Sequence, residues 1–315
     1  MKLAEAREGF LAGQEVRGLS PLTVESRRNL LDEFIGFLAD RGLESVEEAA
    51  REHVEAYRAW MLAHASMRTG RKLAPCTVSR KLWTVKAFFG DLVKRKVIAA
   101  DPARSLAWPK VPARLPRNVP GENQMEDILA RPDVGTAFGL RDRTILEVLY
   151  ATGIRREEAA RLDLYDVNLE ERTLCVRQGK GGKGRTVPLT GTACGFLARY
   201  LKEARPELVR SRGVRRAGAG DPALFVSMRG KRVSKNTLGK LVAAYVHEAA
   251  PGVEKGCHAI RRAFATHMLQ GGANMAYIQR MLGHASIQMT ERYTQLKPME
   301  LKAAHRRHHP RGRAS

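Results

Sequence analysis

Six residues between positions 155 and 293 carry side chains that suit phosphoryl-transfer chemistry: Arg155, Lys180, His258, Arg261, His284 and Tyr293. A phenol is a plausible nucleophile toward phosphorus. Two guanidinium groups can hold the non-bridging oxygens of a phosphodiester, while imidazole and ammonium groups can move the protons that the attacking and leaving oxygens exchange. The residue types therefore predict a site that breaks and rejoins a phosphodiester bond.

The spacing of these residues is compatible with one shared site. Arg155 and Glu158 lie three residues apart, just after Gly153, which is expected to interrupt a helix. On the helix that follows they share a face, and the carboxylate can hold the guanidinium in one rotamer. His258 and Arg261 repeat this spacing at the start of another predicted helix. Tyr293 ends a separate short helical segment and can approach from another side. Taken singly, each pair also fits a surface ion pair, and the tyrosine also fits a core or surface position.

The glycine-rich segment 179–186, GKGGKGRT, is close to a nucleotide-binding phosphate loop but has Arg185 where that motif requires lysine. Such a loop must also open a helix, whereas the following TVPL continues as a strand. The pattern favours a β-hairpin between TLCVRQ and RTVPL, whose tip carries Lys180 into a groove. A flexible basic turn without chemistry fits the same residues. In either case we expect no nucleotide cofactor.

The predicted fold is mainly α-helical with a small β-sheet. Four prolines within residues 108–120 remove amide donors and exclude a helix, which predicts a semi-rigid linker. The linker separates a helical domain, residues 1–107, from a mixed α/β domain, residues 121–315. In the first domain Ser20-Pro21 marks a helix start, and further helices are expected over residues 46–65 and from about Thr77.

The chain of 315 residues is strongly basic, with 55 Lys and Arg against 33 Asp and Glu and a net charge of +22. This excess suggests a polyanionic partner, most often nucleic acid, although a merely soluble basic protein is the alternative. The sequence contains neither a long apolar run nor a signal-peptide pattern, so we expect a cytoplasmic, nucleoid-associated protein without membrane attachment. The four cysteines lack CxxC spacing, which argues against disulfides and structural zinc and favours buried thiols.

Basic residues on two predicted elements are candidate DNA contacts. Some lie off the apolar stripe of the helix from about Thr77 and others at the hairpin, and the candidates are Arg80, Lys81, Lys86, Lys183 and Arg185. A solvated helix face would have the same composition, but the net charge favours a surface that faces DNA.

The motifs TGIRREE, GKG, HAIRR, LGH and the final Tyr293 occur in one order along the chain. Together they resemble the tyrosine recombinases, also called the phage-integrase family, and the resemblance covers nearly the whole chain. The segments RRAFATHML, LGHASIQMTERYT and HHPR are most similar to Xer-type and related mobile-element recombinases. The resemblance implies a helical, SAM-like DNA-binding domain followed by the family's mixed α/β catalytic domain.

The resemblance also implies roles in catalysis. Tyr293 would be the nucleophile, Arg155 and Arg261 would clamp the phosphate, and Lys180 would be the general acid for the 5′-oxygen. The arginines would neutralise the charge that a metal ion neutralises elsewhere, so neither a metal nor a cofactor is expected.

The two remaining histidines would handle and orient protons in this scheme. These are His258 and His284, and Glu158 would support the site from behind. Arg262 departs from the family, which commonly has a second histidine at that position. This position is not assigned to chemistry, so the departure leaves the predicted activity in place.

The implied reaction is DNA strand exchange through a covalent 3′-phosphotyrosine and a Holliday junction. Four protomers, in a homo- or hetero-tetramer, would act on two double-stranded DNA sites with inverted repeats. The segment after Tyr293 is expected to find little of its own chain to pack on and, as in Xer-type relatives, to dock into a neighbouring protomer.

Two other functions stay open from the residues themselves. One is a type IB topoisomerase-like DNA relaxase with the same chemistry, and the other is a non-catalytic DNA-binding protein of the same fold. Chromosome partition, integration, transposition and cassette exchange are equally compatible with the sequence.

Overall fold

The chain folds into two compact units, Met1–Arg114 and Leu115–Ser315. The computed structural model describes residues 1–64, 70, 72–106, 108, 119–177, 184–210, 222–253, 256–283 and 298–313. The division falls within the proline-rich segment 108–120, of which residues 109–118 lie outside the described residues. Lys180, Lys183, His284 and Tyr293 also lie outside them.

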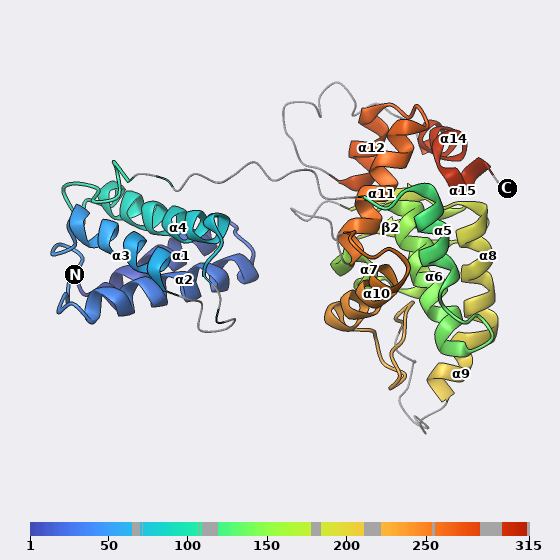
Figure 1. Ribbon diagram of the computed structural model, residues 1–315, viewed down its shortest axis with the longest axis horizontal. Helices are drawn as coiled ribbons and strands as arrows, with labels where there is room; N and C mark the ends of the chain where they lie inside the picture. Colours follow the sequence, from blue (N-terminus) through green and yellow to red (C-terminus); the bar gives the residue numbers. More distant parts are fainter. Residues whose placement is uncertain are drawn as a thin grey trace. The chain divides into compact units, whose positions relative to one another are not determined.

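The N-terminal unit is a bundle of helices, drawn in blue to cyan in Figure 1. Its helices are α1 (Leu3–Val16), α2 (Pro21–Ala39), α3 (Arg51–Ala63) and α4 (Pro75–Lys94). The predicted cap is confirmed, because the Ser20 hydroxyl accepts a hydrogen bond from the Thr23 amide at 3.3 Å. Aromatic rings fill the core; Phe34 meets Phe89 edge to face with centroids 5.9 Å apart.

Helix α1 begins at Leu3, in a segment where charged residues are interspersed among apolar ones. Leu3, Ala6 and Phe10 are nevertheless buried at helical spacing. Glu5 and Glu8 fall on the exposed side of the same helix. The charges therefore mark an amphipathic helix and do not interrupt it.

Of the three DNA-contact candidates on α4, the structure contradicts Lys81. This side chain is buried, and its Nζ donates to both carboxylate oxygens of Glu33 on α2. The lysine lies on the helix face that packs against α2, so it joins two helices of the bundle and cannot reach DNA. Arg80 is exposed, and the Nζ of Lys86 lies 5.7 Å from the ring centroid of Trp108.

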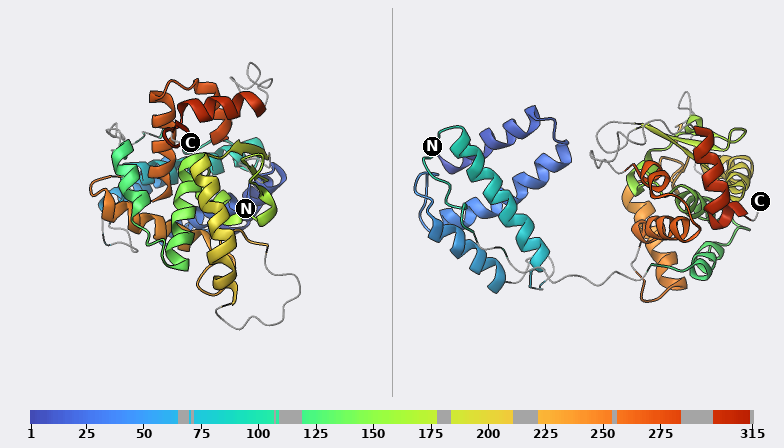
Figure 2. Two further views of the ribbon diagram at one scale, coloured as in Figure 1. Left: turned by 90° about the vertical axis from the view of Figure 1, so that its right-hand side faces the viewer. Right: turned by 90° about the horizontal axis from the view of Figure 1, so that it is seen from above.

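In the C-terminal unit, shorter helices and one small sheet pack around a long central helix (Figure 2). Its helices are α5 (Glu122–Ala130), α6 (Ala137–Thr152), α7 (Arg156–Arg161), α8 (Gly191–Arg199), α9 (Arg205–Arg210), α10 (Lys235–Ala249), α11 (Cys257–Gln270), α12 (Met275–Leu282), α14 (Pro298–His308) and α15 (Pro310–Arg313). Short 3₁₀ and π turns cover Leu164–Asp166 and Tyr200–Ala204. Because α6 is buried from Gly139 almost continuously to Thr152, it forms the axis of this core.

The predicted β-hairpin is confirmed, and a short third strand extends it. The strands β1 (Val167–Asn168), β2 (Thr173–Val176) and β3 (Arg185–Pro188) pair antiparallel in that order. Val176 pairs with Arg185 at the end nearest the glycine-rich tip. Residues 178–183 of that tip lie outside the described residues.

Gly153 ends α6 in the left-handed conformation, with φ of 61°. A Cβ at this position would lie 2.4 Å from Cδ1 of Phe264, so both the backbone angle and the contact require glycine. The predicted helix interruption is therefore correct. The turn at Gly153 places Arg155 at the N-cap position of α7.

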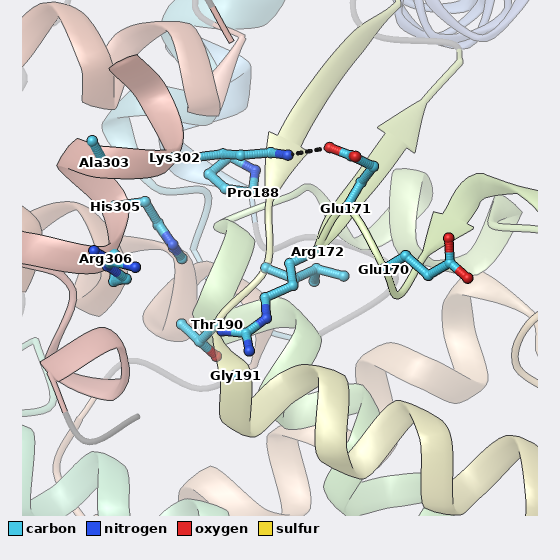
Figure 3. Close-up of a pocket in the computed structure, with 11 residues that line it drawn as sticks. Glu170, Glu171, Arg172, Pro188, Thr190, Gly191, Lys302, Ala303, His305 and Arg306 are labelled. Carbon is cyan, nitrogen blue, oxygen red and sulfur yellow. Dashed lines mark hydrogen bonds and ion pairs between the residues drawn. The ribbon is translucent and has the colours of Figure 1, made fainter. Parts of the chain in front are cut away.

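The C-terminal tail was expected to find little of its own chain to pack on, but in the structure α14 and α15 pack on the C-terminal unit itself. His305 and His309 are 2% and 0% exposed and donate through Nε2 to the carbonyl oxygens of Ala151 and Tyr150, at 2.6 and 3.0 Å. The imidazole rings of both histidines therefore lie in the contact with the end of α6. Figure 3 shows the neighbouring surface, where Lys302 reaches from α14 to Glu171 beside β2.

Two smaller expectations can be compared with the structure. Cys76 and Cys175 are exposed and Cys194 is partly buried, so the expectation of buried thiols holds only for Cys257. Among the described residues, no helix combines the length and hydropathy needed to cross a membrane.

Candidate active site

Arg155 stands at the N-terminal end of α7, where Glu158 holds it at two points. The Arg155 amide donates to Oε2 of Glu158 at 2.8 Å, and its Nη1 donates to Oε1 at 2.9 Å. The predicted three-residue pairing is confirmed by these contacts. The Arg155 side chain stays 28% exposed, so its guanidinium is oriented from behind while one side faces solvent.

Arg261 reaches the same place from α11. Its Nη1 donates to the Gly153 carbonyl at 2.6 Å and its Nη2 to the Leu282 carbonyl at 2.8 Å. Burial, followed by the nearby positive charge of Arg155, lowers the pKa of Arg261 to about 10. The guanidinium remains charged at neutral pH, in an environment where an added anion would be strongly favoured.

The C-terminal end of α12 is where the site's arginines meet. Three consecutive carbonyls, those of Met281, Leu282 and Gly283, accept hydrogen bonds from Arg185, Arg261 and Arg155 in turn. Carbonyls in the last turn of a helix lack helical partners and carry partial negative charge, which matches guanidinium donors. The next residue along the chain is His284, so the predicted histidine directly follows this junction.

Arg185 was expected to contact DNA, but the structure turns it inward. Its side chain is 11% exposed, and its Nη1 and Nη2 donate to the two oxygens of Glu158 at 3.1 and 2.8 Å. Arg185 therefore belongs to the support behind Arg155. Sequence spacing could not reveal this contact, because 27 residues separate the two partners.

Glu158 is a buried carboxylate that pairs with both Arg155 and Arg185. Its side chain is 4% exposed, and burial by itself would raise its pKa. The hydrogen bonds from Arg185, from the Arg155 amide and from the Arg155 guanidinium outweigh burial and lower the pKa to about 2. The carboxylate is thus ionised at all physiological pH values, and it fixes both guanidinium groups.

The structure brings part of the predicted set together. Arg155, Glu158 and Arg261 converge on the end of α12, and His258 lies one helical turn before Arg261 with its side chain exposed. Lys180, His284 and Tyr293 cannot be placed, since they lie outside the described residues. In the described part of the chain, no three His, Cys, Asp or Glu side chains gather as a metal site would require.

Such an arrangement suits a phosphodiester. Two fixed guanidinium groups from different helices converge on one place, and one of them keeps an exposed edge. Planar guanidinium groups hold phosphate oxygens through paired hydrogen bonds and stabilise the charge that develops during transfer.

Comparison with known proteins accounts for most of the chain. Residues 120–300 match the model of the phage integrase family, and residues 9–96 match the phage integrase N-terminal SAM-like domain. The chain is 38% identical over 297 residues to tyrosine recombinase XerC 2 of Ralstonia nicotianae, covering 94% of this chain and 82% of the relative. It is 37% identical over 296 residues to tyrosine recombinase XerD of Pseudomonas aeruginosa, covering 94% of both.

Solved structures share the fold at lower identity. The Tn1549 transposon integrase, in complex with circular intermediate DNA, superposes with a TM-score of 0.68 at 18% identity, covering 96% of this chain and 98% of that one. The XerH recombinase bound to its difH substrate gives a TM-score of 0.64 at 20% identity, covering 96% and 84%. With two matched domains and relatives above 30% identity along nearly its full length, the chain belongs to the tyrosine recombinase, or phage integrase, family.

Proposed function

We propose that this protein is a site-specific DNA recombinase that cuts and rejoins DNA through a covalent 3′-phosphotyrosine at Tyr293. The observation that carries the proposal is the convergence of Arg155 and Arg261 on the carbonyls of Gly283 and Leu282. These carbonyls directly precede the segment that contains His284 and Tyr293. Both the clamp and the chain that bears the nucleophile are thereby tied to one end of α12.

In the proposed reaction the Tyr293 oxygen attacks the phosphorus, its bond to phosphorus forms, and the bond to the 5′-oxygen breaks. The phenolic proton passes to a histidine, His258 or His284, and the leaving 5′-oxygen takes a proton from Lys180. Arg155 and Arg261 hold the non-bridging oxygens throughout. A 5′-hydroxyl from a second duplex then reverses the reaction, so the phosphodiester is restored without ATP.

The nucleophile needs help, because tyrosine has a pKa of about 10 and is protonated at neutral pH. The converging guanidinium groups supply a positive potential that favours the phenolate and the charged transition state. Guanidinium groups can do this work without a metal ion, so the proposed reaction runs in the absence of cofactors.

We further propose that the helical unit and the catalytic unit clamp one inverted-repeat half-site, with the segment around residues 108–120 as linker. Four protomers would assemble on two double-stranded sites. The tail helices α14 and α15 pack on their own domain, so docking into a neighbour requires that the contacts of His305 and His309 be given up first. Exposed Arg80 and partly buried Lys86 on α4 are proposed DNA contacts, as is Lys183 at the hairpin.

The test is covalent capture of a nicked suicide duplex, read by denaturing electrophoresis. Tyr293→Phe should form no adduct while keeping its affinity for a half-site, because only the nucleophilic oxygen is lost. Tyr277→Phe, which removes a partly buried phenol from α12, is the matched control and should form the adduct.

An adduct in the Tyr293→Phe variant would place the nucleophile elsewhere. Relaxation of supercoiled DNA that lacks a recombination site would instead support the topoisomerase-like function. DNA binding without an adduct in the unmodified protein would support the non-catalytic function.

A further inference from the structure

Arg185 is the arginine of the cluster that the proposed chemistry does not use. It comes from β3, beside the glycine-rich hairpin, and it is the most enclosed of the site's ion-paired guanidiniums at 11% exposure, against 28% for Arg155. A phosphate needs an accessible donor edge, and Arg155 keeps one. Each nitrogen of the Arg185 guanidinium donates to a protein atom: Nη1 and Nη2 to Glu158, and Nε to the Met281 carbonyl, 2.7 Å away.

These contacts link three elements that are distant in sequence. Glu158 on α7 is 27 residues from Arg185, and Met281 on α12 is 96 residues from it. The same carboxylate also fixes Arg155. One guanidinium therefore ties the end of α12 to the residue that orients the phosphate clamp.

Gly283 strengthens this assignment through an independent observation. It leaves α12 in the left-handed conformation with φ of 63°, and a Cβ there would lie 3.0 Å from Nη1 of Arg185. The chain thus leaves the helix pressed against this guanidinium. His284 is the next residue, and Tyr293 lies nine positions after it.

We propose that Arg185 is a positioning residue that sets where the nucleophile-bearing segment departs from α12 relative to Arg155. This inference rests on the proposed function, since it assigns Arg185 to the same reaction. Loss of the guanidinium leaves DNA binding in place but releases the end of α12. The tyrosine is then presented less often in line with the phosphorus, and a displacement of about 1 Å can cost on the order of 10²-fold in rate.

The experiment uses the full chain with Arg185→Lys and Arg185→Gln, because neither replacement can bridge a carboxylate and a carbonyl as the planar fork does. Arg143→Lys is a closely matched control. Arg143 is 13% exposed, pairs with the buried Glu147 and donates to the carbonyl of Leu129 near the end of α5, away from α12. Thermal unfolding of all variants shows that they fold.

The first measurement is hydrogen exchange without DNA. Arg185→Lys should speed exchange of amides in the last turn of α12 on the order of tenfold, since a charge-assisted hydrogen bond is lost. Arg143→Lys should leave α12 as it is in the unmodified protein. Unchanged protection of α12 in both Arg185 variants would overturn the proposal, whatever the activity of the protein.

The second measurement is single-turnover cleavage of a saturated suicide duplex, with oxygen or with sulfur as the bridging 5′-atom. Slow cleavage of both substrates by Arg185→Lys, with half-site affinity and the Arg143→Lys rate unchanged, supports a role through α12. Recovery with sulfur, which departs without a proton, would show that Arg185 acts on the general acid Lys180 of its own hairpin and would refute the α12 assignment. A wild-type rate with both substrates would refute it as well. If the unmodified protein forms no adduct, the proposed function fails, while the exchange result still decides the role of Arg185 in holding α12.

Discussion

At the level of single residues, Glu158 is the buried carboxylate that pairs with two arginines of the site. A carboxylate that is 4% exposed would be costly to ionise by itself, yet here it accepts hydrogen bonds from two guanidinium groups and one amide. Breaking a buried ion pair by removing one partner typically costs about 3–5 kcal/mol, because the remaining charge is left without compensation. Glu158 therefore contributes to the stability of the fold and fixes the orientation of Arg155 and Arg185.

Glu158→Gln should lower the free energy of unfolding and slow cleavage at neutral pH. The pKa of Glu158 is lowered to about 2 in the folded protein, from an ordinary value near 4.5. The stability that its charge contributes is thus present above about pH 4.5 and is lost as the pH falls toward 2. Denaturant unfolding should show a large deficit for the variant at pH 7 and a smaller one at pH 3.

The neighbouring Glu157 provides the control for this prediction. It is 44% exposed and pairs with Lys235, so Glu157→Gln should change stability by less than about 1 kcal/mol at either pH. An equal deficit for the Glu158 variant at pH 7 and pH 3 would mean that packing, and not charge, explains its effect.

At the scale of elements, two buried histidines hold the C-terminal helices α14 and α15 against α6. His305 and His309 donate from Nε2 to carbonyls at the end of α6, and Nδ1 of His309 accepts from the Arg311 amide. Burial lowers the pKa of His305 to about 4, and burial together with the charge of His305 lowers that of His309 well below its usual value. Arg311 also pairs with the buried Glu147, so the tail makes charged as well as neutral contacts with α6.

Acidification should loosen this tail. An undocked histidine takes up a proton near pH 6.5, whereas docked His305 resists until about pH 4, so docking weakens as the pH falls through that window. Each such histidine can weaken docking by up to about tenfold per pH unit. Hydrogen exchange of residues 298–309 should be slow at pH 7.5 and, after correction for the intrinsic rate, faster at pH 5.

Two variants test the cause of this pH dependence. A double variant, His305→Phe with His309→Phe, should lose it, because no buried imidazole remains at these positions. His247→Gln alters an exposed histidine of α10, and this variant should keep the pH dependence of the tail. A pH dependence that survives in the double variant would assign the effect to other groups that face the tail, such as His267 or Glu147.

On the scale of the whole molecule, the net charge of +22 is the property most relevant to DNA. Some basic groups are engaged inside the protein, as Lys81 is with Glu33, so the charge available to phosphates is smaller than composition suggests. Arg80 on the surface of α4 is available by exposure. Binding to a half-site should still be governed by the release of counterions.

We expect the half-site association constant to fall steeply with salt, by about 10³-fold or more between 50 and 200 mM if six or more phosphates are contacted. Fluorescence anisotropy across this range measures the slope. Arg80→Ala should reduce the slope by about one unit, whereas Lys81→Ala, which removes a buried residue, should leave it unchanged. Equal slopes for the unmodified protein and the Arg80 variant would remove Arg80 from the DNA interface.

The sequence by itself determined the features that act over one or two helical turns. Ser20 caps α2, Gly153 ends α6, and Arg155 pairs with Glu158 because each involves residues at most four positions apart. The hairpin of β2 and β3 was also readable, since alternating residues and a glycine-rich turn specify it locally. The order of the motifs then pointed to the family, which the comparisons confirm.

Tertiary structure decided the contacts between residues that are distant in the chain. Arg185 and Lys81 both looked like DNA contacts, and each instead pairs with a glutamate, 27 and 48 residues away. His305 looked like part of a tail without a partner and is bound to a carbonyl 154 residues earlier. Composition shows that a side chain is charged or polar, but the path of the backbone decides which buried group of opposite charge or hydrogen-bonding character it meets.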